Sequence, residues 1–336
     1  MFISIVLFII GLVLLIFCGD WFVDGATGIA RKFHIPELII GATVVSIGTT
    51  LPEVMVSADA AIKGQGATDY GNAIGSIICN TALILAITIA VKPSKVDKKS
   101  LKTPVIFFFV AALIYVLNAY IFKRFSLASG IVLLSVFIIY MIYTVITTKK
   151  RMAQEVKTTE PVEENQNEEE EEEKEKKEKP VWQNILLLVV GAIGIAFGAN
   201  LLVDNGVIIA GAMGVPESVI ALTMIALGTS LPELVTAITS LVKGHGSLSL
   251  GNIIGANFFN LVLVSGISTT LSPFDLPVEK TIGGLNASLV VDLPLMIIVM
   301  LIVTIPALIK GKLTRAQGII LLVLYAVSYT HLRAHE

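Results

Sequence analysis

The chain has 336 residues, of which 55% are hydrophobic and 15% are charged, and its mean hydropathy is +0.85. This composition excludes an ordinary soluble domain and is typical of an integral membrane protein. The formal net charge of −2 gives no support for nucleic acid binding.

Hydropathy and the positions of polar breaks predict about ten membrane-spanning helices, each near the roughly 20 residues that a bilayer core requires. The first segment has no basic region and no Ala-x-Ala cleavage site, so we interpret it as the first span and not as a removed signal peptide. The fold class that follows is an all-α integral membrane protein. The predicted spans cover residues 2–30, 36–62, 69–91, 103–122, 126–148, 183–210, 216–242, 248–270, 287–309 and 314–330.

The two halves of the chain resemble each other at a constant spacing of 180 residues. Residues 48–53 (Gly-Thr-Thr-Leu-Pro-Glu) in the second span return as residues 228–233 (Gly-Thr-Ser-Leu-Pro-Glu) in the seventh. Each half contains about five spans, an odd number, so the second half enters the membrane from the opposite side. We therefore predict two inverted five-helix repeats, at 1–148 and 182–330, with broken helices at the midplane. Further pairs at this spacing are Pro36 and Pro216, Gly71 and Gly251, Asn72 and Asn252, and Asn80 and Asn260.

The positive charges of the connecting segments indicate the orientation of the chain. With the N-terminus outside, the outside loops contain only Lys63, Lys123, Arg124 and Lys280. We therefore expect a multi-pass protein of the cell (inner or plasma) membrane, with both termini outside. The positive residues then on the cytoplasmic side are Arg31, Lys32, Lys92, Lys95, Lys98, Lys99, Lys102, Lys149, Lys150, Arg151, Lys243, Lys310, Lys312 and Arg315.

Two polar segments lie outside the predicted repeats. Residues 149–181 include an unbroken run of glutamates from Glu168 to Glu173, and they are too polar to form a core. We interpret them as a cytoplasmic linker, disordered or transiently helical; a calcium-sensing role for the glutamate run is the alternative. Residues 331–336 are interpreted as a non-native or truncated tail and are assigned no function.

The repeated Pro-Glu pairs indicate a cation site. Glu53 and Glu233 are predicted near the middle of spans, where a charge is most costly and needs a compensating partner. Because Pro52 and Pro232 have no N–H, each leaves a carbonyl about four residues upstream without its donor. The neighbouring glycines ease unwinding there, and hydroxyl groups lie beside the freed backbone. Carboxylate, carbonyl and hydroxyl oxygens are the ligands that suit calcium and sodium.

Inverted symmetry is expected to bring the two glutamates together at the midplane. A divalent ion, or two monovalent ions, would offset their repulsion. The amides of Asn80 and Asn260 are candidates to complete the oxygen shell, although buried asparagines in membrane helices also serve only to bridge helices. Ser76 shares a helical face with Asn80. Asn72 and Asn252, near helix starts, are predicted to cap or bridge.

Other reactive residue types form no recognisable site. Cys18 and Cys79 lie in apolar segments outside any Cys-x-x-Cys pattern, so we interpret them as packing residues. The four histidines show no zinc spacing. Because no Ser/His, Cys/His or metal-hydrolase set is present, we do not expect an enzyme or a resident cofactor.

These motifs resemble those of the cation/calcium exchanger superfamily, specifically the prokaryotic sodium/calcium exchangers, over nearly the whole chain. The resemblance implies that spans one and six slide across a core of eight helices. It implies Glu53 and Glu233 as principal ligands. The supporting ligands it implies are Asn80, Asn260, Ser76, Thr49, Thr50, Thr229 and Ser230, with backbone carbonyls of Ser46 and Ala226.

Two positions depart from patterns of that family. Asn260 stands where some sodium/calcium exchangers have an aspartate, and Ala256 replaces the serine expected opposite Ser76. These changes leave open the sodium stoichiometry and a part for potassium or protons.

The function expected from the sequence is secondary antiport, in which sodium entry drives calcium exit and both ions bind as transported substrates. We expect the protein to act as a monomer in the lipid bilayer. Calcium/proton or potassium-dependent antiport is the nearest alternative. A calcium channel is an alternative of a different class, because oxygen-lined pores also use acidic rings.

Overall fold

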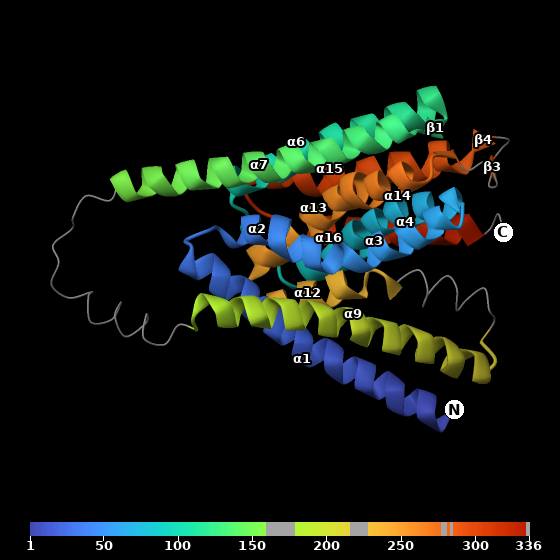
Figure 1. Cartoon of the computed structure of the whole chain (residues 1–336), viewed down its shortest axis with the longest axis horizontal. Helices are drawn as coiled ribbons and strands as arrows, with labels where there is room; N and C mark the ends of the chain where they lie inside the picture. The colour runs from blue at the N-terminus through green and yellow to red at the C-terminus, as the bar shows by residue number, and fades with distance from the viewer. Residues whose placement is uncertain (159–178, 216–227, 277–280, 283–284, 334–336) are drawn as a thin grey trace.

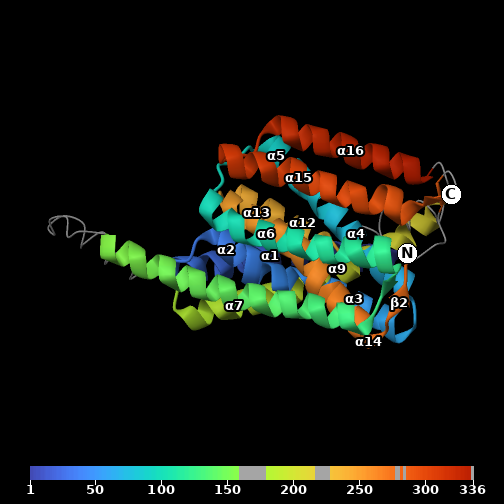
Figure 2. The ribbon, with the colours of Figure 1, turned by 90° about the horizontal axis from the view of Figure 1, so that it is seen from above.

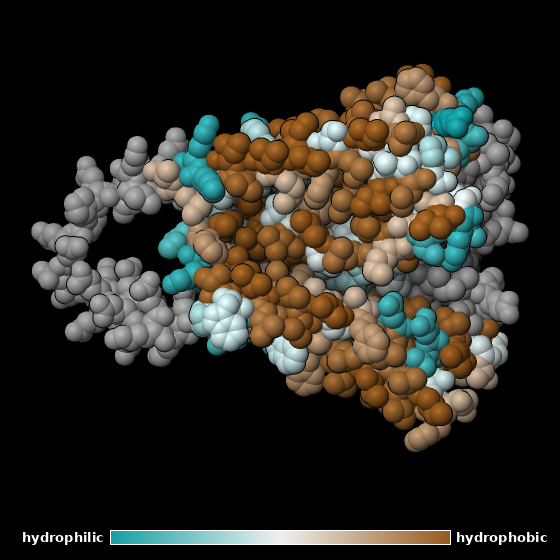
Figure 3. Space-filling model, in the orientation of Figure 1, coloured by the Kyte–Doolittle hydropathy of each residue, from teal (hydrophilic) through white to brown (hydrophobic). Residues whose placement is uncertain are grey.

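The computed structural model describes residues 1–158, 179–215, 228–276, 281–282 and 285–333. Nearly all of these residues are helical, and the long helices run side by side along one direction (Figure 1). The all-α prediction is therefore confirmed. A space-filling view shows hydrophobic residues across the middle of one face and hydrophilic residues gathered toward its two ends (Figure 3), as expected for a protein that crosses a bilayer.

Eight helical segments among the described residues are long and apolar enough to cross a membrane. They agree with eight of the predicted spans, mostly within a few residues. Two shorter apolar helices, Leu231–Val242 and Arg315–Val327, lie where the seventh and tenth spans were predicted. The count of ten stays a prediction, because residues 216–227 of the seventh span lie outside the described residues. The eight long segments are Phe2–Lys32, Glu37–Ile62, Thr68–Val91, Lys98–Phe122, Leu127–Ala153, Val181–Ala212, Gly246–Leu271 and Ser288–Lys310.

The first half of the chain contains seven α-helices and three short π-helical segments that continue or precede them. The elements in chain order are α1 (Phe2–Lys32), α2 (Glu37–Ile40), η1 (Gly41–Val45), α3 (Ser46–Ile62), α4 (Gly66–Cys79), η2 (Asn80–Leu85), α5 (Ala86–Val91), α6 (Lys98–Leu117), η3 (Asn118–Phe122), β1 (Arg124–Phe125) and α7 (Leu127–Thr158).

The described elements of the second half are α9 (Val181–Ala212), α12 (Leu231–Val242), α13 (Gly246–Phe259), η5 (Asn260–Val264), α14 (Ser265–Leu271), β2 (Phe274–Asp275), β3 (Thr281–Ile282), β4 (Leu285–Asn286), η6 (Ser288–Asp292), α15 (Leu293–Lys310) and α16 (Arg315–Arg333). In the second half, η5 follows α13 as η2 follows α4, whereas η6 precedes α15 and η3 follows α6.

Helices α1 and α9 pack against each other along one edge of the molecule, opposite α6 and α7 (Figure 1). Glycines permit this close approach. A Cβ atom added at Gly11 would lie 2.8 Å from the carbonyl oxygen of Gly198, and one at Gly191 would lie 2.7 Å from the backbone nitrogen of Phe22. Backbone therefore lies directly on backbone in this pair.

Helix α13 occupies the middle of the remaining helices, between the α15 and α16 pair and α7 (Figure 2). In the apolar stretch of Gly246–Leu271, which contains α13, 89% of the residues are buried inside the protein. The corresponding shares are 28% for Phe2–Lys32 and 22% for Val181–Ala212. The repeated Pro-Glu segments therefore pack on a helix that is enclosed by protein.

Two short backbone pairings join the halves at opposite ends of the bundle. Lys95, which precedes α6, pairs with Lys312 in an antiparallel bridge. After α6 and η3 have crossed the molecule, Arg124 pairs with Asp275 between β1 and β2. Lys95 and Asp275 stand at the repeat spacing of 180, so equivalent contacts occur at the two ends.

Two local features differ from the sequence prediction. The unwinding expected at residues 48–50 is absent, since Pro52 lies inside the continuous helix α3; the irregular turn is η1, which ends before Ser46. The Ser46 hydroxyl, 2.6 Å from the carbonyl oxygen of Gly41, supports that earlier turn. In addition, α7 continues to Thr158, inside the predicted linker, where Arg151 forms an ion pair with Asp97 at 3.2 Å.

Candidate cation site

The two repeated glutamates lie together inside the molecule. Glu53 belongs to α3 and Glu233 to the first turn of α12, and both side chains are 0% exposed. Their carboxyl groups are close enough to interact electrostatically. None of the four carboxyl oxygens has a hydrogen-bond partner among the described residues. Two buried acids without donors are costly unless a positive charge lies between them, so the pair has the chemistry of a cation site.

The repeated asparagines, Asn80 and Asn260, are also 0% exposed, and neither amide has a hydrogen-bond partner among the described residues. Each begins a π-helical turn: η2 starts at Asn80 and η5 at Asn260. Single π turns inside α-helices are frequent at functional sites. The two amides thus occupy matching irregular positions in the two halves, with oxygen atoms free to bind a cation.

Three hydroxyl groups accompany the acids. Thr50 and Ser230 are buried, and their hydroxyl oxygens have no partner in the described part of the chain. Thr49 lies beside the Glu233 carboxyl and also contacts Oδ1 of Asn252 at 3.1 Å. The first half therefore contributes an oxygen atom beside the acid of the second half.

The remaining predicted ligands are placed less directly. Ser76 is buried one turn before Asn80 on α4, and Thr229 is half-buried in the turn that precedes α12. The Ser46 hydroxyl lies 3.0 Å from the carbonyl oxygen of Asn252 and so ties α3 to α13. Ala226 lies outside the described residues.

Asn72 and Asn252 connect α4 and α13 to α3, the helix that bears Glu53, in the bridging role predicted for them. Asn72 Nδ2 donates to the carbonyl oxygen of Glu53 at 3.2 Å and to the Ser57 hydroxyl at 2.9 Å. Asn252 accepts hydrogen bonds from α3 through both its side chain and its carbonyl oxygen. These contacts fix the orientation of α3 on α4 and α13.

Cys79 was not predicted to lie near the glutamates. This residue, interpreted as packing, lies beside Ser230 and near both glutamates, and it is 4% exposed. Its position directly before Asn80 was the available signal. Its thiol is a soft, weakly polar group that does not compete for a hard cation.

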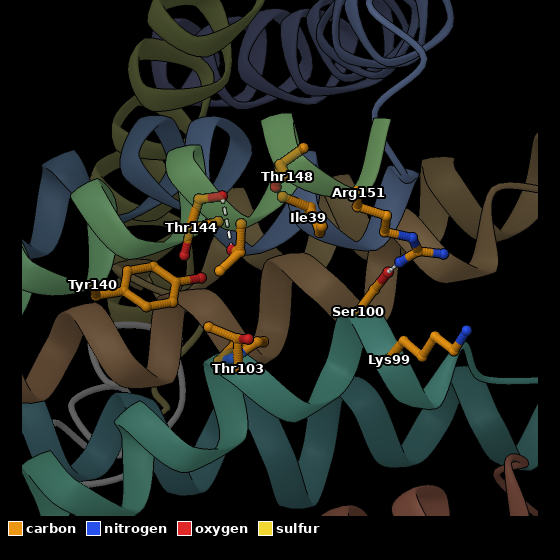
Figure 4. A pocket seen from close by; sticks show the side chains of 10 residues that line it. Ile39, Lys99, Ser100, Thr103, Tyr140, Thr144, Thr148 and Arg151 are labelled. Carbon is orange, nitrogen blue, oxygen red and sulfur yellow. Dashed lines mark hydrogen bonds between the residues drawn. The ribbon is translucent and has the colours of Figure 1, made fainter. Parts of the chain in front are cut away.

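A separate cleft lies between α2, α6 and α7, away from the glutamates (Figure 4). Hydroxyl groups line it, and Arg151 donates to Ser100 at its rim at 2.9 Å. Tyr140, also in its lining, donates to the carbonyl oxygen of Ala42 at 2.8 Å. The cleft therefore lies next to η1, and Tyr140 supplies the hydrogen-bond donor for one carbonyl group of that segment.

Comparisons with known proteins agree with this fold. The profile of the family described as sodium/calcium exchanger protein matches residues 3–146 and 183–332. The putative antiporter CaxA of Alkalimonas amylolytica is 33% identical over 338 residues, 99% of each chain. The sodium/calcium exchanger MaX1 of Methanosarcina acetivorans is 29% identical over 345 residues, 96% of each chain.

A solved structure of the sodium-calcium exchanger NCX_Mj has the same fold. It superposes with a TM-score of 0.78 at 31% sequence identity, and the match covers 98% of both chains. The match spans both halves, including the segments that bear Glu53 and Glu233. The chain therefore belongs to the sodium/calcium exchanger protein family, a family of membrane antiporters.

Proposed function

We propose that this protein exchanges sodium for calcium at one central site, with Glu53 and Glu233 as the principal ligands. The observation that supports this most is the buried, unpartnered pair of carboxyl groups contributed by the two halves. Two negative charges match one calcium ion or two sodium ions. The proposed supporting ligands are Asn80, Asn260, Ser76, Thr49, Thr50, Thr229, Ser230 and the carbonyls of Ser46 and Ala226.

Coupling follows from competition for the same acids. An empty site would leave two bare charges to be enclosed, so the conformational change is favourable only after either cargo has neutralised them. Because calcium and sodium exclude each other at the central site, each conformational change carries either calcium or sodium across the membrane. This arrangement favours a carrier over a channel.

The α1 and α9 pair is the proposed moving part. Their mutual contacts exceed those that either makes with the rest of the bundle. At one end, Lys243 Nζ lies 2.5 Å from Asp20 and 2.6 Å from Asp24 of α1. Burial alone would lower the pKa of Lys243, but its bonds to the two aspartates outweigh burial, and the pKa is raised. Sliding of α1 requires these ion pairs to break.

The opposite end has no equivalent tie among the described residues. Lys63, which stands at the repeat spacing from Lys243, pairs with Asp59 of its own helix at 2.5 Å. With the N-terminus outside, Lys243 belongs to the cytoplasmic side, so the tied end is cytoplasmic. We place the protein in the cell membrane as a functional monomer with its central linker in the cytoplasm.

Ion flux in proteoliposomes tests the coupling. Calcium uptake into the vesicles is expected when the sodium concentration is higher inside than outside. No uptake is expected from a pH or potassium gradient alone. Uptake driven by a pH gradient and indifferent to sodium would instead establish calcium/proton exchange. Calcium flux that needs no counter-ion on the other side would contradict antiport altogether.

A further inference from the structure

A third buried acid lies apart from the glutamate pair. Asp69, in α4, is 0% exposed, and neither of its carboxyl oxygens has a hydrogen-bond partner among the described residues. It lies in the first turn of α4, yet no backbone N–H there donates to it. A helix N-terminus therefore does not account for this charge.

Hydroxyl groups from two other helices lie beside Asp69, and a phenol from a third helix lies near it. The Ser57 and Ser268 side chains, from α3 and α14, lie beside its carboxyl group but outside normal hydrogen-bond geometry. Both are buried, and the Ser268 hydroxyl has no partner among the described residues. The phenol of Tyr115, from α6, is close enough to interact with the charge of Asp69.

Aromatic rings cover this group of residues. Phe125 of β1 is 0% exposed, stacks on Phe274 of β2 at 5.0 Å between ring centroids, and lies 4.6 Å from the Tyr115 ring. A Cβ atom at Gly66 would collide with the Phe274 side chain, so the β1 and β2 pair lies directly on the start of α4. Water is thus kept from Asp69 by the loops at this end.

The fold itself does not require an acid at this position. At the repeat spacing, the counterpart of Asp69 is Ser249, which is 2% exposed, and the counterpart of Ser57 is Ala237. The second half builds the same helix pair without a charge. The acid is therefore an addition to the architecture of one half, at one end of the molecule.

We propose that Asp69, Ser57 and Ser268 form a second cation site, which binds one sodium ion. The site has one carboxylate, so a monovalent ion balances its charge, whereas a divalent ion would leave an unpaired positive charge in a dry interior. Two serine hydroxyls lie beside the carboxylate, and carboxylate with hydroxyl oxygens is a ligand set that suits a hard metal ion and that a bound proton would not need.

This site is linked to the central pair through one side chain. Asn72 Nδ2 contacts both the Ser57 hydroxyl and the carbonyl oxygen of Glu53, and Ser57 follows Glu53 by one helical turn. An ion held by Ser57 would therefore act on the same segment of α3 that bears the central acid. One sodium ion would therefore bind at the Asp69 site, which calcium does not occupy.

Equilibrium binding of radioactive sodium to the purified protein, kept saturated with calcium, tests the site. Wild-type protein is expected to bind one more sodium ion than Asp69→Asn or Asp69→Ser, the latter being the residue that the second half uses. Asp59→Asn, which removes an exposed acid of α3, is the matched control and is expected to bind as the wild type does. Glu233→Gln separates this site from the central one, because it is expected to lose calcium transport while the sodium ion at Asp69 is retained.

Equal sodium binding by wild type and both Asp69 variants would overturn the proposal. So would an Asp69 variant whose transport changes its pH dependence while its sodium binding is unchanged, because the charge would then be balanced by a proton. If the Asp69 variants do not fold, Ser57→Ala and Ser268→Ala decide the question: a several-fold weaker sodium affinity supports the site, and an unchanged affinity refutes it.

Discussion

At the scale of single residues, the central feature is the burial of Glu53 and Glu233 side by side without hydrogen-bond donors. The repeated Pro-Glu pair was enough to predict that the two acids lie close together inside the protein. Cys79 directly precedes Asn80, but this position alone did not predict its contact with Ser230, because the sequence does not say which neighbours the end of α4 meets. Helical spacing placed Ser76 and Asn80 on one face, but only packing selects the neighbours of that face.

Replacing one acid by its amide tests the pair. Glu53→Gln or Glu233→Gln is expected to weaken calcium binding by about 3 kcal/mol, or roughly a hundredfold, because one charged ligand is lost. Without added ions, the variant is expected to unfold at the same or a higher temperature, since one of two like charges has gone. Calcium-dependent shifts of the unfolding temperature measure both effects.

Asp59→Asn is the control for that measurement, because it removes an exposed carboxylate paired only with Lys63. It is expected to keep the calcium-dependent shift. A normal shift in both glutamine variants would remove these acids from the ligand set.

At the scale of elements, hydropathy and breaks predicted the long helices closely, since burial in lipid dictates an apolar stretch of nearly fixed length. The π-helical segments were not predictable. Whether a turn takes one extra residue depends on contacts from other helices. In η1, for example, the Tyr140 hydroxyl of α7 donates a hydrogen bond to the carbonyl oxygen of Ala42. The predicted unwinding at residues 48–50 failed for the same reason, whereas the turn before Leu231 lies where the sequence indicated.

The glycine contact between α1 and α9 is testable at this scale. Gly191→Ala places a methyl group within 3 Å of the α1 backbone, so the helices must separate, at an expected cost of about 1–3 kcal/mol. The temperature of thermal unfolding and the rate of transport are both expected to decrease. Gly211→Ala, on the same helix but with nothing within 4 Å of the added Cβ atom, is the control and is expected to leave both unchanged.

At the scale of the whole molecule, the pairings at Lys95 and Lys312 and at Arg124 and Asp275 each join one half to the other. The halves are therefore attached to each other at both ends of the bundle. Rocking of one half against the other would break these pairings, whereas sliding of α1 and α9 would not touch them. This geometry favours movement of the helix pair over movement of the halves.

Paired cysteines distinguish the two movements. In a background without Cys18 and Cys79, oxidised Lys95→Cys/Lys312→Cys is expected to retain transport. Oxidised Gly19→Cys/Thr239→Cys, where a Cβ atom on α1 would lie 3.3 Å from the Thr239 hydroxyl of α12, is expected to stop transport until a reductant is added. Inhibition by the first crosslink and not by the second would show that the halves themselves move.

The enclosure of α13 separates the proposed ion ligands from the lipid. This helix, which leads into Asn260, touches almost only protein, whereas α1 and α9 present most of their surface to the surroundings. A thicker or thinner bilayer would therefore act on the tilt and travel of the outer pair and not on the spacing of the oxygen atoms. Membrane composition is thus expected to set the speed of turnover while leaving ion preference unaltered.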